Sequence, residues 1–140
     1  MSLEVVDVIK PDDHAVVKAG LAERAVAKGV PPRVTRPLAV MKRDNQNKIE
    51  AGLCGETFWT WLYVDEIWVH EDLRGHGLGR TLMQAAETEA IKRGCTGAYL
   101  WTQDFNAPGF YEKLGYERFV EMSGFPTGHQ RIGFMKQLAA

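Results

Sequence analysis

Apolar residues recur along this chain with two periods, and each period predicts a different kind of element. Over residues 11–28 they recur at helical spacing, which predicts an amphipathic helix that ends at Gly29. A second helix is predicted over residues 78–93, where Gly94 provides the end, and a short third helix over residues 108–114.

Runs rich in β-branched and aromatic residues, separated by polar or glycine-containing turns, predict strands. These runs cover residues 3–9, 37–42, 49–57, 58–69, 97–102, 116–122 and 131–138. The second and third runs form a hairpin around the polar turn at 43–47. Because the helix over 78–93 acts as a crossover between strands, we expect an α/β (α+β) fold with a mixed sheet.

The whole chain, residues 1–140, is predicted to form a single domain. Its length suits one sizeable core, and no repeat, low-complexity tract or linker interrupts it. The formal net charge of −1 shows no global bias toward nucleic acid, so no nucleic-acid partner is expected. Ligands in such mixed sheets tend to bind where neighbouring strands diverge at their carboxyl ends.

Cysteine usage and the N-terminus bear on location. Cys54 and Cys95 are far apart and make no zinc pattern with the four histidines, so we expect no metal and a reduced protein. The N-terminus lacks the basic-then-apolar layout of a secretion signal, and no apolar run is long enough to cross a bilayer. A cytoplasmic protein without a membrane partner is therefore expected.

Three alternate glycines, Gly75, Gly77 and Gly79, lie between the predicted strand over 58–69 and the helix that follows. Backbone N–H groups at such a helix start can approach an anion without intervening Cβ atoms, so a phosphate is the natural ligand. The spacing matches neither the Walker loop nor the dinucleotide-binding loop. The alternative is that these glycines only make a tight turn.

The spacing of Arg74, Gly77 and Gly79 resembles the signature of the GNAT superfamily of acyl-CoA-dependent N-acyltransferases. That signature is Arg or Gln, two residues, Gly, one residue, then Gly or Ala. Residues 110–116 (FYEKLGY) resemble a second family signature, a short helix with an aromatic pair followed by Leu-Gly-aromatic. Two separated motifs in the expected order make the resemblance far more specific than either motif alone.

The resemblance implies a GNAT-like, mostly antiparallel sheet of about six to seven strands with helices on both faces. A splayed parallel strand pair forms the acyl-CoA cleft in that fold, and the strand end over residues 67–69 usually bulges. Acetyl-CoA (coenzyme A) is the implied cosubstrate, and the glycine loop would hold its pyrophosphate. The residues expected to bind it are Ile67, Trp68, Val69, Arg74, Gly75, His76, Gly77, Leu78, Gly79, Arg80 and Asn106.

The resemblance also assigns proton-transfer roles. Tyr111 matches the residue that commonly donates a proton to the leaving thiolate, although a tyrosine there could instead only pack under the cofactor. Glu66 is our first choice for the base and Asp65 the second, acting directly or through a water. Strand alternation sends these two neighbours to opposite faces. Either acid could instead pair with a basic side chain or only attract a cationic amine.

One position departs from the family pattern. An Asn commonly lies seven residues before the aromatic residue that Tyr111 matches, but that position here is Asp104. The nearest Asn is Asn106, which suggests that the connection into the short helix is shorter by two residues. Asn106 is carried over as a cofactor contact on that basis.

Aromatic and acidic residues around the expected cleft bear on the acceptor. The aromatic set is Phe58, Trp59, Trp61, Tyr63, Trp68, Trp101 and Phe125, and the acids are Glu56, Asp65 and Glu66. Aromatic rings with acids suit a small cationic or heterocyclic amine. The alternative is that most of these rings belong to the core of the sheet.

The leading expectation is an enzyme that moves an acetyl group from acetyl-CoA to a primary amine, by direct attack through a ternary complex. An acyl-CoA-binding sensor or scaffold without turnover is the alternative within this fold. A phosphate-binding protein unrelated to CoA remains a third class. Family members often dimerise, so a homodimer through the strands ending at Leu138 is also considered, against an edge covered within the chain.

Overall fold

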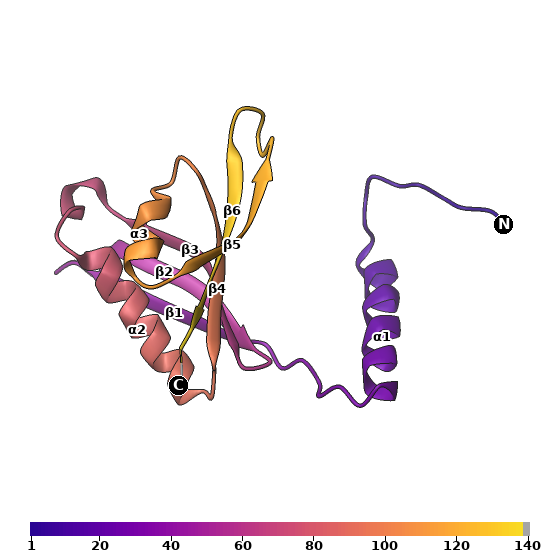
Figure 1. Ribbon diagram of the computed structural model, residues 1–140. Coiled ribbons are helices and arrows are strands. Elements are labelled where there is room, and N and C mark those ends of the chain that lie inside the picture. Colours follow the sequence, from indigo (N-terminus) through magenta and orange to yellow (C-terminus); the bar gives the residue numbers. More distant parts are fainter. Residues whose placement is uncertain (139–140) are drawn as a thin grey trace. The chain divides into compact units, whose positions relative to one another are not determined.

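The computed structural model describes residues 1–138 and divides into two compact units, Met1–Val34 and Thr35–Ala140 (Figure 1). The first unit contains helix α1 (Pro11–Ala27), which confirms the first predicted helix. Proline at its first turn and two acidic residues beside it suit the positive end of a helix dipole. Gly29, with φ +74°, follows the helix end in the left-handed conformation.

The strand predicted over residues 3–9 is wrong, because this segment forms no strand in the structure. β-branched residues favour a strand only where a neighbouring strand supplies ladder hydrogen bonds and a surface to pack on. Within Met1–Val34 the only regular element is α1, so the segment has no such neighbour in its own unit.

The second unit is built on a six-stranded sheet with the order β1-β2-β3-β4-β6-β5. Its strands are β1 (Arg36–Arg43), β2 (Ile49–Phe58), β3 (Trp61–Val69), β4 (Gly97–Gln103), β5 (Glu117–Ser123) and β6 (Gln130–Gln137). Only β3 and β4 pair in parallel, and α2 (Leu78–Lys92) connects them. A short 3-10 helix, η1 (Glu71–Leu73), and helix α3 (Pro108–Lys113) complete the unit. The predicted α+β fold with a mixed, mostly antiparallel sheet is confirmed.

One predicted strand, over residues 58–69, is divided by a tight turn. Phe58 ends β2, Trp61 begins β3, and Trp59 and Thr60 between them have φ values of +44° and +64°. Such angles are uncommon for residues other than glycine, asparagine and aspartate. Because Trp59 and Thr60 are none of these, the sequence did not predict a turn here.

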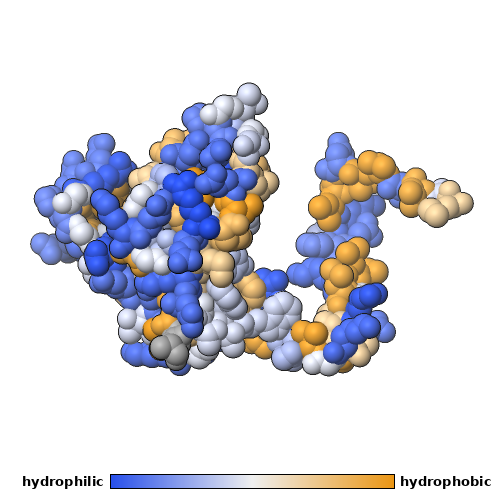
Figure 2. Space-filling view, in the orientation of Figure 1, coloured by the Kyte–Doolittle hydropathy of each residue, from blue (hydrophilic) through white to orange (hydrophobic). Residues whose placement is uncertain are grey.

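Helix α2 packs against β1, β2 and β3 on one face of the sheet. Its apolar stripe of Leu82, Met83, Ala86 and Ala90 is buried, whereas hydrophilic residues cover most of the surface around α2 (Figure 2). The largest fully buried side chains lie in β2, β3, β4, β6 and α2, and they are Phe134, Leu53, Leu62, Met83, Leu100 and Ile132. Among residues 1–138, no helix is both long and apolar enough to span a membrane.

A β-bulge in β3 opens the sheet beside this core. The β2–β3 register passes from Gly55 opposite Val64 to Cys54 opposite Glu66, which leaves Asp65 as the extra residue. The parallel pairing of β3 with β4 ends at Val64 opposite Leu100, although β4 stays paired with β6 as far as Gln103. The two strands therefore diverge beyond Val64, and the bulge lies just before the 67–69 segment where the resemblance placed it.

Candidate active site

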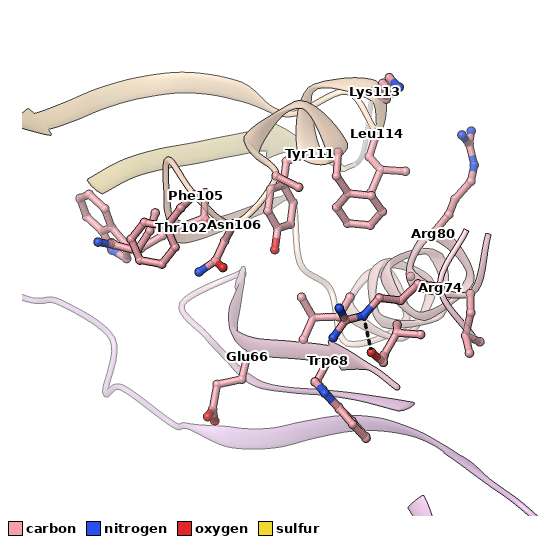
Figure 3. Close-up of a pocket in the computed structure, with 18 of the residues that line it drawn as sticks. Glu66, Trp68, Arg74, Arg80, Thr102, Phe105, Asn106, Tyr111, Lys113 and Leu114 are labelled. Carbon is pink, nitrogen blue, oxygen red and sulfur yellow. Dashed lines mark hydrogen bonds between the residues drawn. The ribbon is translucent and has the colours of Figure 1, made fainter. Parts of the chain in front are cut away.

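The divergence of β3 and β4 opens a cleft of about 1230 Å³. Its walls are the ends of these two strands, the loop before α2, the helix α3, and parts of β6 and the loop before it (Figure 3). The structure brings together most of the predicted site residues: Asp65, Glu66, Ile67, Trp68, Val69, Arg74, Gly75, Gly77, Leu78, Gly79, Arg80, Asn106 and Tyr111 all line it. His76, in the same loop, does not line the cleft.

The loop into α2 presents a row of unpaired backbone donors. Gly75 and Gly77 have φ values of +83° and +80°, which glycine adopts at little cost. The first backbone bond of the helix is from the Thr81 N–H to the Gly77 carbonyl, 3.0 Å long. Within the described part of the chain, the N–H groups of residues 75–80 donate no hydrogen bond. Six free donors at the positive end of a helix fit an anionic group such as a pyrophosphate.

Two contacts hold this loop in place. The Arg74 side chain donates from Nε to the carbonyl oxygen of Val69 at 2.9 Å, which ties the loop to the end of β3 (Figure 3). A Cβ atom on Gly79 would lie 3.2 Å from Cζ of Phe110, so the first turn of α2 touches α3 closely at a position that suits glycine. The two sequence motifs are therefore in direct contact.

Tyr111 lies on α3 and is only 7% exposed. Its ring packs 5.6 Å from that of Phe134 and 6.3 Å from that of Tyr116, between centroids. Its hydroxyl points into the cleft toward β3 (Figure 3) and makes no hydrogen bond with any residue that the structure describes. Burial raises the pKa of Tyr111 above its ordinary value of 10.0, so the phenol stays protonated at neutral pH. The side chain thus offers a proton donor to whatever fills the cleft.

Asp65 and Glu66 both line the cleft, so the prediction that alternation separates them is wrong. The reason is the bulge, which adds Asp65 to β3 and breaks the two-residue period at that point. Asp65 accepts a long hydrogen bond from the Tyr63 hydroxyl, at 3.4 Å. Glu66 makes no hydrogen bond or ion pair with residues 1–138, which leaves its carboxylate available to a ligand.

The departure from the family pattern has a structural counterpart. Asp104 turns toward the loop between β5 and β6, where its carboxylate accepts from the Gln130 N–H at 2.9 Å and contacts His129 Nδ1 at 3.0 Å. Asn106 lines the cleft (Figure 3), and its backbone N–H donates to the Gln103 carbonyl at 3.0 Å. Asp104, at the family's Asn position, therefore holds the loop before β6, while the side chain of Asn106 lies at the cleft.

We expect Asp104→Ala to lower the free energy of unfolding by about 1–3 kcal/mol, because it leaves the half-buried Gln130 N–H without its acceptor. Asp104→Asn keeps a carbonyl oxygen at that position and should cost much less. Urea unfolding of the two variants measures the difference. Equal losses for both would show that the loop does not depend on this acceptor.

The aromatic residues expected around the acceptor divide into two groups. Tyr63, Trp68, Trp101 and Phe125 line the cleft. Phe58, Trp59 and Trp61 do not; they lie around a separate apolar hollow, with Tyr99, Phe119 and Met135. Glu56 does not line the cleft either. Sequence reasoning missed Arg131, which lines the cleft from β6 and belongs to no motif.

Comparison with known proteins agrees with this geometry. The sequence profile of the acetyltransferase (GNAT) family matches residues 21–116. The chain is 38% identical over 112 residues to the blasticidin-S acetyltransferase of Streptomyces morookaense, covering 77% of this chain and 82% of that protein. It is 28% identical over 94 residues to the thialysine N-epsilon-acetyltransferase of Bos taurus, covering 63% of this chain and 55% of that protein.

A crystal structure from Agrobacterium tumefaciens superimposes with a TM-score of 0.85 at 30% sequence identity. The match covers 98% of this chain and 99% of that one, so it includes nearly every element described above. The profile match, the sequence relatives and the shared fold lead to one conclusion: this chain belongs to the acetyltransferase (GNAT) family.

Proposed function

We propose that this protein transfers the acetyl group of acetyl-CoA to a primary amine of a small molecule, by direct attack while both substrates are bound. The observation that carries the proposal is one cleft that is lined by Tyr111, by Glu66 and by the loop into α2, where Gly75 and residues 77–80 have free N–H groups. Acetyl-CoA fits this cleft because the donor row suits its pyrophosphate. The two sequence relatives support a small acceptor, since their names specify blasticidin S and thialysine.

The chain's own groups can hold the thioester arm of the cosubstrate. Beyond Val64, β3 has lost its pairing with β4, so backbone groups on that side of residues 65–68 are open to a ligand, whereas the Val69 carbonyl already accepts from Arg74. These groups would pair with the pantetheine amides and place a donor near the thioester oxygen, where negative charge develops. The N–H row of residues 75–80 would fix the opposite end.

Acetyl-CoA supplies an activated acetyl group: a C–N bond to the amine forms as the C–S bond breaks. The Glu66 carboxylate, or Asp65 beside it, would take a proton from the incoming ammonium group, directly or through a water. Tyr111 would give its hydroxyl proton, or a strong hydrogen bond, to the departing sulfur. Glu66 is favoured over Asp65 because Tyr63 already contacts the Asp65 carboxylate.

We expect Glu66→Gln to lower kcat/KM roughly 10²-fold at neutral pH, because a neutral amide cannot take the proton. The deficit should shrink as the pH rises, since more of the free amine is then already deprotonated. Asp65→Asn should have a smaller effect, and Glu71→Gln, an acid outside the cleft, should have none. The pH profile of kcat/KM for the four proteins measures this. A deficit for Glu66→Gln that is constant with pH would argue for a purely electrostatic role.

Amine-dependent release of free CoA thiol from acetyl-CoA tests the proposed function as a whole. Each amine of a chemically varied panel is added to the enzyme with saturating acetyl-CoA, and thiol release is followed over time. The proposal predicts release that depends on both enzyme and amine. Tight acetyl-CoA binding without turnover of any amine would instead favour a sensor or scaffold.

A further inference from the structure

Arg131 lines the cleft from β6 and has no role in the proposed reaction. Its guanidinium carbon lies 4.5 Å from the ring centroid of Trp101 and 5.0 Å from that of Phe125. Gln103, the β4 neighbour of Arg131 in register, donates from Nε2 to the Phe125 carbonyl oxygen at 2.6 Å. This bond fixes the Phe125 loop against β4, so the guanidinium is held between two rings.

Arg131 has no close acidic partner among the residues that the structure describes. Its guanidinium forms no ion pair and no hydrogen bond with residues 1–138, although Asp65 and Glu66 line the same cleft. The charge nevertheless acts on Tyr63, which lines the same cleft. Burial is the main cause that raises the pKa of Tyr63; the negative charge of Asp65 raises it further, and the positive charge of Arg131 lowers it. A half-buried guanidinium with free donors is a ready partner for a carboxylate or phosphate.

Arg131 lies at the end of the cleft away from the glycine loop of residues 75–80. In Figure 3, Arg74 and Arg80 lie on one side of Tyr111, and Thr102, Phe105 and Asn106 lie on the other. Arg131 is opposite Gln103 in the β4–β6 register, directly after Thr102. The cation is therefore placed for the acceptor rather than for the phosphates of acetyl-CoA.

We propose that the acceptor carries an anionic group, a carboxylate or a phosphate, in addition to its amine, and that Arg131 binds this group. The inference rests on the proposed function and names the substrate class of the same site. The ammonium end would lie near Asp65 and Glu66, and the anionic end at the guanidinium. A simple diamine would place a second positive charge beside Arg131, which costs free energy. Arg131 thereby becomes a specificity-determining residue.

Matched pairs of amines with and without an acid group test this. L-lysine is compared with 1,5-diaminopentane for the carboxylate, and O-phosphoethanolamine with ethanolamine for the phosphate. Two quantities are measured for each: kcat/KM by thiol release, and the dissociation constant from the enzyme–CoA complex by calorimetry. We expect the acid-bearing member of at least one pair to bind and react better with the parent protein, and the pair concerned distinguishes carboxylate from phosphate.

Arg131→Gln should weaken binding of that acid-bearing amine about 10- to 100-fold, the loss expected for charged hydrogen bonds, and should not weaken binding of the counterpart that lacks the acid group. Arg131→Lys should recover part of the loss, since it keeps the charge without the planar fork. Arg43→Gln, which removes an exposed arginine from the β1–β2 hairpin, is the matched control and should change neither. Thermal unfolding of each variant confirms that it is folded.

Several outcomes would overturn the inference. These are a parent protein that prefers the amines without acid groups, one that binds no member of either pair, and equal losses for both members of a pair in Arg131→Gln. The calorimetric arm separates this failure from failure of the proposed function. If no amine releases thiol but acid-bearing amines still bind through Arg131, the anion site is supported and the proposed acetyl transfer is contradicted.

Discussion

Replacement of Tyr111 by phenylalanine is expected to lower kcat roughly 10²-fold, the scale of losing one positioned proton donor. Its hydroxyl is the part of the buried side chain that points into the cleft, and this hydroxyl makes no hydrogen bond with any described residue. Tyr111→Phe therefore removes a catalytic group without removing a structural hydrogen bond. The free energy of unfolding should change little, and the affinity for acetyl-CoA should stay close to that of the parent.

Tyr116→Phe is the matched control for this prediction. Tyr116 is equally buried, but its hydroxyl donates to Glu87 Oε2 at 2.8 Å, away from the cleft. Its loss should lower stability by about 1 kcal/mol or more with little effect on kcat. Rates at saturating substrates and urea unfolding of both variants separate the two effects. A Tyr111→Phe enzyme with unchanged kcat would leave the side chain only a packing role.

The second large effect is expected for Gly77→Val, which should weaken acetyl-CoA binding by about tenfold or more. Gly77 is the N-cap residue just before α2 and has φ +80°, where a side chain costs about 1–2 kcal/mol and a branched one more. Space is not the problem, since no described atom lies within 4 Å of the added Cβ. The change instead distorts or covers the row of N–H donors that the pyrophosphate needs.

Gly94→Val serves as the control, because Gly94 has a similar φ of +87° and an equally open surrounding at the other end of α2. Both variants should lose comparable stability. Only Gly77→Val should raise the dissociation constant of acetyl-CoA in calorimetric titration. Similar dissociation constants of acetyl-CoA for the two variants would show that the glycine loop of residues 75–80 does not bind the cosubstrate.

Much of the fold followed from local patterns. The helix that becomes α2 was predicted to within a residue because its apolar period, glycine stop and sheet-facing stripe all agree. The β1–β2 hairpin followed from its polar turn. Two predictions were wrong for opposite reasons. Residues 3–9 have the composition of a strand but no partner strand, whereas Trp59 and Thr60 make a turn without the residues typical of turns.

The residues that line the cleft were predictable where they belong to motifs and not where they depend on pairing between strands. The glycine loop and the Tyr111 helix are each continuous in sequence, so each could be matched to a family signature. The bulge at Asp65 is a property of the β2–β3 register, and it reversed the inference that Asp65 and Glu66 face opposite sides. Arg131 reaches the cleft only through the β4–β6 pairing, and a single arginine in a strand gives no signal of its own.

A single-turnover experiment distinguishes direct transfer to the amine from transfer through the protein. Enzyme in excess is loaded with acetyl-CoA that carries an isotopic label in its acetyl group, and an amine accepted in the thiol-release panel is added. Direct transfer predicts that the label moves to the amine in one step as free CoA appears, with none on the protein. Label that stays in acetyl-CoA for every amine, or that accumulates on the protein, would contradict direct transfer in this cleft.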